Sequence, residues 1–201
     1  MRGLKKGAEG AAISKIRKRI ASACRRDPAL SESTPVFGDG PVPSGLMVVG
    51  EAPGRSETKL GRPFVGRAGT FFFDIVEDVF ERPREELYIT NVVKVWPKID
   101  TERGRTRPPT RAEIAFFLPY LKEEIVAVGP ATIVAVGKVA FTALVPQGEF
   151  IPGAWAEYGS GVPVMPVYHP AYILRKQKSL RELTAGLRTA LREVKGRLNS
   201  S

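Results

Sequence analysis

His169 is the single histidine of a 201-residue chain. It follows an apolar run at residues 162–167, with only Tyr168 in between. This pattern predicts a buried strand that ends at a loop carrying the imidazole. Because the reference pKa of histidine is about 6.5, an imidazole placed there can donate a hydrogen bond to a developing negative charge at neutral pH. A histidine that only tethers a turn is the alternative at this point.

Two other apolar runs end at residues of chemical interest. Residues 46–49 are followed by Gly50-Glu51-Ala52-Pro53-Gly54, and residues 87–90 are followed by Asn91. Glycine lets main-chain amides approach a ligand closely, which suits an anion or a carbonyl oxygen. The loop after Gly50 is not a P-loop, because no Gly-Lys-Ser/Thr closes it, and its glycine spacing does not match the dinucleotide fingerprint.

Apolar strands alternate with segments of helical periodicity along the chain. Strands are predicted at residues 46–49, 87–90, 132–136 and 163–168, and helices at residues 13–23, 68–80, 111–128, 138–144 and 179–197. The alternation predicts an α/β fold, a three-layer α/β/α sandwich with a central four-stranded parallel sheet. Ligands of such sheets bind outside the carboxyl ends of the strands. We therefore expect Gly50, Asn91 and His169 to contribute to one composite site.

The size and charge of the chain indicate one domain with two basic ends. With 201 residues and 43% apolar content, a single core is expected. Its parts are a basic N-terminal helix and lead-in loop (residues 1–35), a motif-bearing core (36–175) and a basic C-terminal helix (176–201). The net charge is +10. Its concentration at the two ends indicates either solvated helix faces or a surface that follows nucleic-acid phosphates.

Composition also limits the cofactors and the compartment. Cys24 is the only cysteine, so the chain can form no intrachain disulfide and cannot supply four thiolates. No apolar stretch approaches the ~20 residues of a membrane span, and residues 1–10 are too polar for a secretory signal, so we expect an intracellular, cytoplasmic protein. Two asparagines and two glutamines beside 26% charged residues predict a thermophilic source.

Residues 97–110 and 148–161 show no hydrophobic periodicity. We expect a long loop at 97–110 and an irregular or hairpin excursion at 148–161.

Four segments resemble motifs of the family 4 uracil-DNA glycosylases. They are residues 50–54, 61–69 (Gly-Arg-Pro-Phe-Val-Gly-Arg-Ala-Gly), 88–94 (Tyr-Ile-Thr-Asn-Val-Val-Lys) and 169–175 (His-Pro-Ala-Tyr-Ile-Leu-Arg). The resemblance implies a monofunctional base-excision repair enzyme that flips deoxyuridine out of DNA and hydrolyses its N-glycosidic bond, leaving an abasic site. The alternative is a catalytically weak or inactive module that keeps the pocket and binds uracil or DNA.

The resemblance implies three contacts to the flipped base. Phe64 stacks on the pyrimidine, Asn91 pairs with O4 and N3–H of uracil, and His169 donates to O2 as the glycosidic bond breaks. Cytosine presents the opposite donor and acceptor pattern to the Asn91 amide, so the residue type fits independently. Their structural alternatives are a core phenylalanine, an asparagine turn and a turn-tethering histidine.

Catalysis and base selection involve the loop after Gly50. The main-chain amides of Glu51 and Ala52 are expected to assist at uracil O2. Glu51 either orients water or stabilises the sugar cation, or it only structures its own loop. Ala52 stands where uracil-DNA glycosylases with a clear general base carry an aspartate. By resemblance, Glu57 excludes the C5 methyl of thymine, with an exposed loop carboxylate as the alternative.

The expected macromolecular partner is DNA that contains uracil. Predicted phosphate contacts are Arg62, Arg67 and Arg175, and Arg103, Arg105 and Arg107 are predicted to form a strap along the DNA phosphates. Tyr172 to Leu174 are expected to wedge into the gap left by the flipped base. Solvated arginines are the alternative. We expect a monomer, and a sliding clamp or a downstream abasic-site endonuclease is the kind of protein partner that the resemblance leaves open.

Family 4 members typically hold a 4Fe–4S cluster on four cysteines, and this chain departs from that pattern. Val95 and Phe117 stand at two of the expected ligand positions. We therefore predict no iron–sulfur cluster and no metal, with Val95, Trp96, Phe116 and Phe117 filling the volume. Purified protein should be colourless and fully active, and an iron–sulfur absorption band would contradict this prediction.

Overall fold

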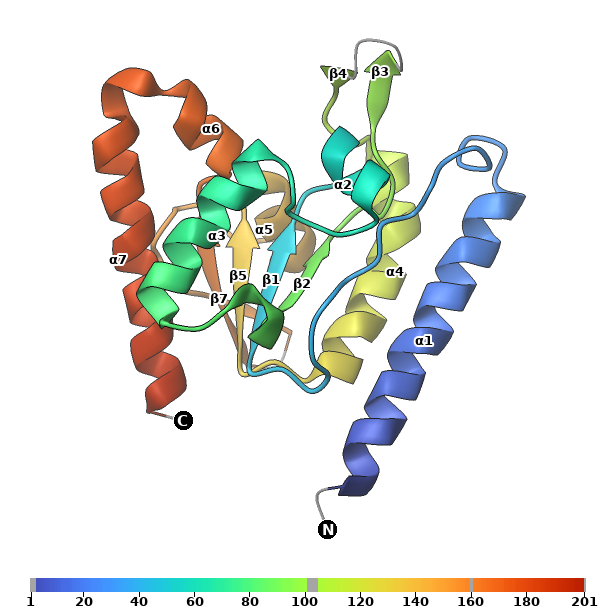
Figure 1. The fold of residues 1–201 in the computed structure, drawn as a ribbon, viewed down its shortest axis with the longest axis horizontal. Coiled ribbons are helices and arrows are strands. Elements are labelled where there is room, and N and C mark those ends of the chain that lie inside the picture. Colours follow the sequence, from blue (N-terminus) through green and yellow to red (C-terminus); the bar gives the residue numbers. More distant parts are fainter. Residues whose placement is uncertain (1–2, 101–104, 160, 201) are drawn as a thin grey trace.

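A five-stranded sheet lies at the centre of the fold (Figure 1). The computed structural model describes residues 3–100, 105–159 and 161–200. The strands of the sheet, in chain order, are β1 (Leu46–Gly50), β2 (Tyr88–Asn91), β5 (Thr132–Val136), β6 (Ala156–Tyr158) and β7 (Val162–Val167). Their spatial order is β2-β1-β5-β7-β6.

The four predicted strands are all present and run parallel to one another. The α/β/α class is confirmed, but the sheet has a fifth strand, because β6 pairs antiparallel with β7 at one edge. Positive φ angles of 58° at Gly159 and 126° at Gly161 belong to the turn between these strands, and glycine adopts them without strain. The excursion predicted at residues 148–161 is thus partly a hairpin strand.

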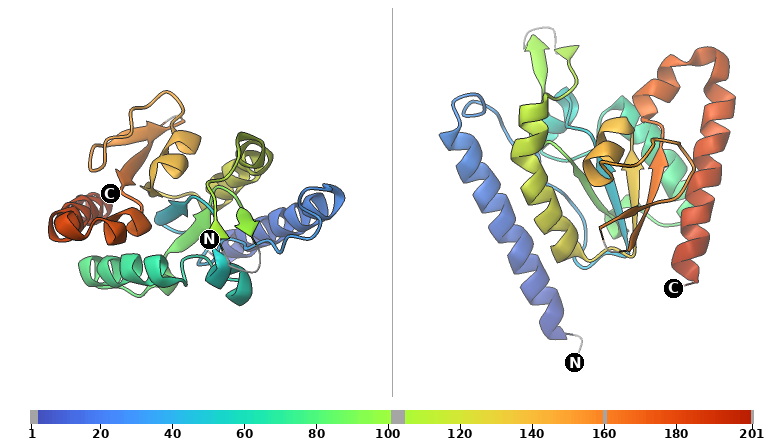
Figure 2. Two further views of the ribbon diagram at one scale, coloured as in Figure 1. Left: turned by 90° about the horizontal axis from the view of Figure 1, so that it is seen from above. Right: turned by 180° about the vertical axis from the view of Figure 1, so that it is seen from behind.

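Helices cover both faces of the sheet (Figures 1 and 2). On one face lie α1 (Gly3–Arg26), α4 (Arg111–Val128) and α5 (Lys138–Leu144). On the other lie α3 (Arg67–Phe80), α6 (Pro170–Arg175) and α7 (Leu180–Asn199). Alternate residues of each buried strand point to opposite faces, so Met47 and Val49 join the first core cluster while Leu46 and Val48 join the second.

Short elements lie beyond the ends of the strands. Towards the carboxyl ends are α2 (Arg55–Leu60), the two-stranded ribbon of β3 (Lys98–Asp100) and β4 (Arg105–Thr106), and the 3-10 helix η2 (Gln177–Ser179). The 3-10 helix η1 (Arg84–Glu86) leads into the amino end of β2. The prediction of an unstructured loop at residues 97–110 was therefore wrong in part. The N-terminal helix is also longer than the predicted residues 13–23.

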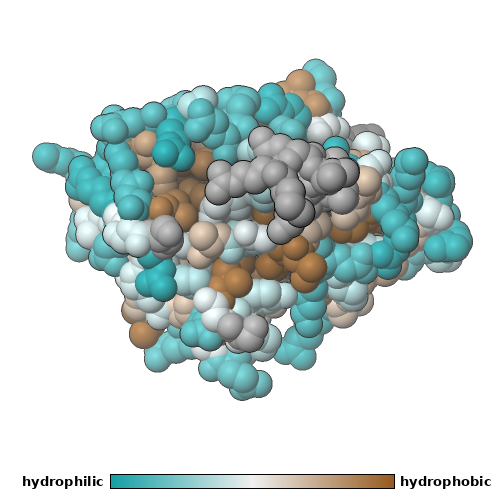
Figure 3. Space-filling view, turned by 90° about the horizontal axis from the view of Figure 1, so that it is seen from below, coloured by the Kyte–Doolittle hydropathy of each residue, from teal (hydrophilic) through white to brown (hydrophobic). Residues whose placement is uncertain are grey.

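The amino ends of the strands form the opposite end of the molecule. Seen from that side, hydrophilic side chains surround separate hydrophobic ones (Figure 3). Within the described ranges, no helix combines the length and the apolar character that crossing a bilayer requires. The features of chemical interest gather instead around the carboxyl ends.

Candidate active site

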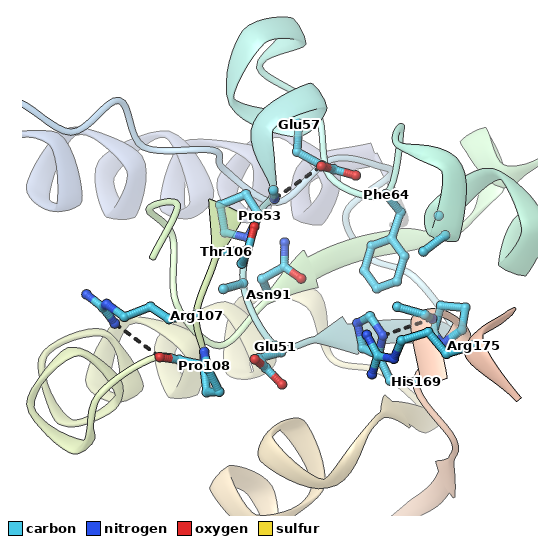
Figure 4. A pocket seen from close by; sticks show the side chains of 16 residues that line it. Glu51, Pro53, Glu57, Phe64, Asn91, Thr106, Arg107, Pro108, His169 and Arg175 are labelled. Atoms are coloured by element: carbon cyan, nitrogen blue, oxygen red, sulfur yellow. Dashed lines mark hydrogen bonds between the residues drawn. The ribbon is translucent and has the colours of Figure 1, made fainter. Parts of the chain in front are cut away.

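A pocket of about 490 Å³ opens at the carboxyl end of the sheet (Figure 4). The loops after β1, β2 and β7 form it together with residues 64–69 and the end of the β3–β4 ribbon. Its lining residues are Glu51, Ala52, Pro53, Gly54, Glu57, Phe64, Ala68, Gly69, Asn91, Thr106, Arg107, Pro108, His169, Pro170, Ala171 and Arg175. Phe64, Asn91 and His169, which are far apart in the sequence, thus meet in one cavity.

The loops after β1 and β2 are held in register by main-chain hydrogen bonds. Gly50 and Asn91 are paired residues of the two strands. The amides of Val92 and Val93 donate to the carbonyls of Gly50 and Glu51 at 2.9 and 3.0 Å. A Cβ at position 50 would lie 2.3 Å from Asn91 Oδ1 and 2.5 Å from Phe64 Cζ. Only glycine therefore lets the amide and the ring come this close to the strand.

A buried ion pair lies behind Asn91. Lys94 Nζ donates to the Asn91 carbonyl at 2.7 Å, to Thr90 Oγ1 at 2.7 Å and to Glu124 Oε2 at 2.6 Å. The side chains of Lys94 and Glu124 are 0% and 1% exposed. Burial lowers the pKa of Lys94, and the carboxylate of Glu124 opposes that shift. The three N–H donors of the ammonium are all used, so the main chain at Asn91 is firmly fixed.

Phe64 presents its ring to the pocket from a left-handed main-chain conformation. Its φ is 55°, which is unfavourable for a bulky residue. The ring is 7% exposed and packs against Phe72 and Phe73, with centroids 5.8 and 5.7 Å away. Phe64 is thus both a wall of the pocket and the edge of the second core cluster. The two predicted alternatives, a ring available for stacking and a core phenylalanine, are therefore not exclusive.

His169 is oriented as the N-cap of α6. Its Nδ1 accepts a hydrogen bond from the Ala171 amide at 3.2 Å. Burial and the nearby Arg175 lower the pKa of His169 to about 4, and Glu57 opposes the shift. The imidazole is therefore neutral at pH 7, and because Nδ1 is the acceptor, the proton lies on Nε2. Nε2–H remains available as a donor to a ligand.

The two carboxylates of the pocket differ in their partners. Glu57 Oε1 accepts from the Gly66 amide at 2.8 Å, and Oε2 accepts from the Gly54 amide at 3.1 Å, so this side chain ties two loops together. Among the described residues nothing pairs with the Glu51 carboxylate, and burial raises its pKa. Glu51 is thus the carboxylate free to act on a ligand or water, and Glu57 is the one that structures loops.

The predicted DNA-contacting arginines occupy different settings, and Arg103 lies outside the residues that the structure describes. Arg175 lines the pocket, whereas Arg67 and Arg105 are exposed beside it. Arg107 also lines the pocket, but its two terminal nitrogens donate to Glu113 at 2.7 and 2.8 Å. These bonds help to lower the pKa of Glu113 to about 2. Arg62 donates to Asp39 at 2.8 Å and lies 3.5 Å from Glu85, outside the pocket lining.

The predicted wedge segment is part of α6. Ile173 is 0% exposed and belongs to the second core cluster, so it cannot enter DNA without leaving the core. Tyr172 is half-buried and stacks on Tyr168 with centroids 5.1 Å apart. Leu174 is partly exposed. Only Tyr172 and Leu174 of this segment keep surface for a partner.

Part of the pocket wall was not predicted from the sequence. Thr106 and Pro108, at the end of the β3–β4 ribbon, line the pocket together with Ala52 and Pro53 of the loop after β1. The Trp96 indole N–H donates to Thr106 Oγ1 at 2.9 Å and so fixes the ribbon. The only signal in the sequence is the aromatic residue before a proline-rich segment, which is too general to locate a wall.

The residues present do not fit a four-thiolate cluster. Val95 and Phe117 are 1% and 0% exposed and share one apolar cluster with Cys24. Burial raises the pKa of Cys24 to about 11, so this thiol stays protonated. Phe116 packs against the same cluster, whereas the expected contribution of Trp96 goes to the ribbon. Within the described part of the chain, no group of three or more His, Cys, Asp or Glu side chains is placed to hold a metal ion.

Comparison with known proteins agrees with this geometry. Residues 37–192 match the family model described as the uracil DNA glycosylase superfamily. The chain belongs to the uracil DNA glycosylase superfamily. The matched region contains the residues of the pocket from Glu51 to Arg175, so the superfamily assignment covers the whole candidate site.

Several relatives within the superfamily carry the name Type-4 uracil-DNA glycosylase. The protein from Thermotoga maritima is 34% identical over 154 residues, covering 75% of this chain and 77% of the relative. The protein from Pyrobaculum aerophilum is 37% identical over 153 residues, covering 70% and 74%. The protein from Archaeoglobus fulgidus is 33% identical over 180 residues, covering 85% and 86%. The source organisms of these relatives agree with the thermophilic composition.

Proposed function

We propose that this chain hydrolyses the N-glycosidic bond of deoxyuridine in DNA, releasing uracil and leaving an abasic site. The observation that carries the proposal is the meeting of Phe64, Asn91 and His169 in one pocket. Relatives named Type-4 uracil-DNA glycosylase support the same activity. The described pocket lining contains no lysine that could attack the sugar, which supports a monofunctional reaction with water.

Base recognition follows from the pocket walls. A base stacked within a duplex cannot reach a recessed cavity, so the nucleotide must be flipped out. Phe64 then stacks on the pyrimidine, and the Asn91 amide donates to O4 and accepts from N3–H. Cytosine would place a donor against a donor and an acceptor against an acceptor, and each mismatch costs about 1–3 kcal/mol.

Catalysis is proposed to come mainly from stabilisation of the leaving group. As the glycosidic bond breaks, electrons move onto the ring, and His169 Nε2–H donates to O2, with the main-chain amides of Glu51 and Ala52 in support. These contacts strengthen as charge develops, so they lower the barrier more than they tighten substrate binding. Glu51 orients the attacking water, since its carboxylate has no protein partner among the described residues and burial raises its pKa.

Contacts to the DNA backbone are proposed for the arginines at the rim. Arg175, Arg67 and Arg105 are the readiest phosphate contacts because they are exposed beside the pocket. Arg62 and Arg107 would have to exchange a carboxylate partner for a phosphate. Tyr172 and Leu174 are the proposed surface against the neighbouring bases.

Exclusion of thymine is proposed for Glu57. The carboxylate holds the main chain of Gly54 and Gly66, and Gly66 closely follows Phe64 in the chain. A C5 methyl would then meet a wall that cannot retreat without breaking these two hydrogen bonds.

Strand scission at a single deoxyuridine tests the proposal. Reaction products are heated in alkali, which cleaves DNA at abasic sites, on U·G and U·A duplexes and on single strands. We expect cleavage at catalytic enzyme concentrations. DNA binding without cleavage would favour the alternative of a module that has lost turnover. A hypoxanthine substrate run alongside defines the range of bases.

Replacing Asn91 by alanine should lower kcat/KM for uracil by about 10-fold to 100-fold, because two base contacts are lost. The measurement is the initial rate of excision from a labelled oligonucleotide. Asn199→Ala is the matched control, since Asn199 is exposed at the end of α7. Full excision by Asn91→Ala would remove the recognition assigned to this residue.

Replacing Gly50 by alanine should abolish most uracil excision and destabilise the fold by about 1–3 kcal/mol, because the new Cβ displaces Asn91 or Phe64. Gly45→Ala is the control, because nothing lies within 4 Å of a Cβ at Gly45. Excision rates and thermal melting are measured on both variants. Unchanged excision by Gly50→Ala would show that the amide and the ring can move without loss of function.

A further inference from the structure

The main chain at Phe64 is strained and tightly enclosed. A left-handed conformation at a bulky residue costs about 1–3 kcal/mol and persists only where the surroundings impose it. Gly69 permits this close packing, because a Cβ there would lie 2.4 Å from the Phe64 carbonyl. The ring that walls the pocket is therefore carried by a backbone that other residues must hold in place.

Arg84 constrains this backbone directly through hydrogen bonds. From η1, its Nη1 donates to the Phe64 carbonyl at 3.0 Å and its Nη2 donates to the Pro63 carbonyl at 2.8 Å. The guanidinium also lies over the Phe73 ring, 4.5 Å from the centroid. Phe73 in turn packs edge-on against Phe64. One side chain thus holds both the main chain of the loop and the aromatic support of the ring.

The chemistry of this contact requires arginine. A planar guanidinium presents parallel N–H groups to two successive carbonyls and can stack on an aromatic face at the same time. A lysine ammonium has neither the fork nor the flat surface. Arg84 is not among the residues that line the pocket, so it does not contact a bound base directly.

We propose that Arg84 is a positioning residue, which holds Phe64 in the orientation that stacks on the flipped pyrimidine. The inference rests on the proposed function, since it assigns Phe64 its ligand. Arg84 acts through Phe64 alone, so its contribution to uracil recognition disappears when the Phe64 ring is absent.

A double-mutant cycle tests this coupling. Arg84→Met removes the donors and keeps most of the apolar length of the side chain. We expect it to lower kcat/KM on a single-stranded uracil oligonucleotide about tenfold in the wild-type background and less than about twofold in a Phe64→Ala background. Arg84→Lys should behave as Arg84→Met does. The same cycle is measured in Kd for an oligonucleotide with 2′-fluorodeoxyuridine, whose glycosidic bond resists hydrolysis.

The controls separate positioning from general stability. Arg188→Met removes an arginine that pairs with Asp78 of α3 away from the pocket, and it should leave kcat/KM unchanged. Arg84→Gln, which keeps one amide donor, replaces Arg84→Met in the cycle if the latter does not fold. Equal loss in both backgrounds, or no loss in the wild-type background, overturns the proposal. A wild-type chain that binds but releases no uracil refutes the proposed function instead, and the Kd cycle still decides the role of Arg84.

Discussion

Replacing His169 by alanine should lower kcat for uracil release by about 100-fold to 1,000-fold and leave the affinity for uracil-containing DNA nearly unchanged. The reason is that Nε2–H meets a full negative charge only as the glycosidic bond breaks. Single-turnover excision rates and fluorescence anisotropy on the same oligonucleotide separate the two effects. Equal losses in rate and affinity would mean that His169 acts in binding and not in leaving-group stabilisation.

The lowered pKa of His169 gives this prediction a pH dependence. The imidazole titrates near 6.5 in the unfolded chain and at about 4 in the folded one. As the pH falls from 6.5 towards 4, the unfolded chain gains a proton that the folded chain does not bind. This contribution to stability is therefore complete above pH 6.5 and is lost progressively down to about pH 4. The wild type should lose more stability over this range than His169→Ala, whereas kcat should show no step near pH 6.5 from this residue.

Replacing Lys94 by methionine should reduce the free energy of unfolding by about 3–5 kcal/mol, because it leaves the Glu124 carboxylate buried without its cation. The loss should be severe because Glu124 Oε1 already has no hydrogen-bond partner in the described part of the chain. Equilibrium unfolding in denaturant measures it. Lys122→Met, an exposed change on the same helix as Glu124, should change stability by less than about 0.5 kcal/mol.

A second substitution distinguishes the loss of stability caused by the unpaired buried charge from the loss caused by poorer packing. Lys94→Met combined with Glu124→Leu removes both charges, and it should recover much of the stability because apolar replacements of buried ion pairs are often tolerated. If the double variant is as unstable as Lys94→Met, the ion pair is not the cause of the loss. Uracil excision by a stable double variant then reports how far Lys94 fixes Asn91.

Much of the fold could be predicted because its central strands are buried on both faces. Continuous apolar runs such as residues 46–49 indicate strands of a parallel sheet, and helical periodicity places the covering layers between them. The edge strand β6 was expected only as part of an irregular or hairpin excursion, because Ala156–Tyr158 is short, polar at Glu157 and paired on one side only. The β3–β4 ribbon was missed for a similar reason, since it is exposed where the structure describes it.

The candidate site could be predicted where a side chain follows a buried strand, as Asn91 and His169 do. Parallel strands bring their carboxyl ends together, so the convergence follows from topology. The different roles of the Glu51 and Glu57 carboxylates could not be predicted, because the hydrogen-bond partners of Glu57 depend on how the loop returns to Gly66. Arg84 was missed because it contacts main-chain carbonyls, which leave no mark in the sequence.

The pairing of Gly50 with Asn91 has a consequence for changes in chain length. Successive residues of a strand face opposite sides, so one residue inserted within β1 or β2 would turn the side chains beyond it to the other face. Insertions in the connections that precede the amino ends of β1 and β2 leave Gly50 and Asn91 in register. Among natural variants of this chain we therefore expect no gap within either strand.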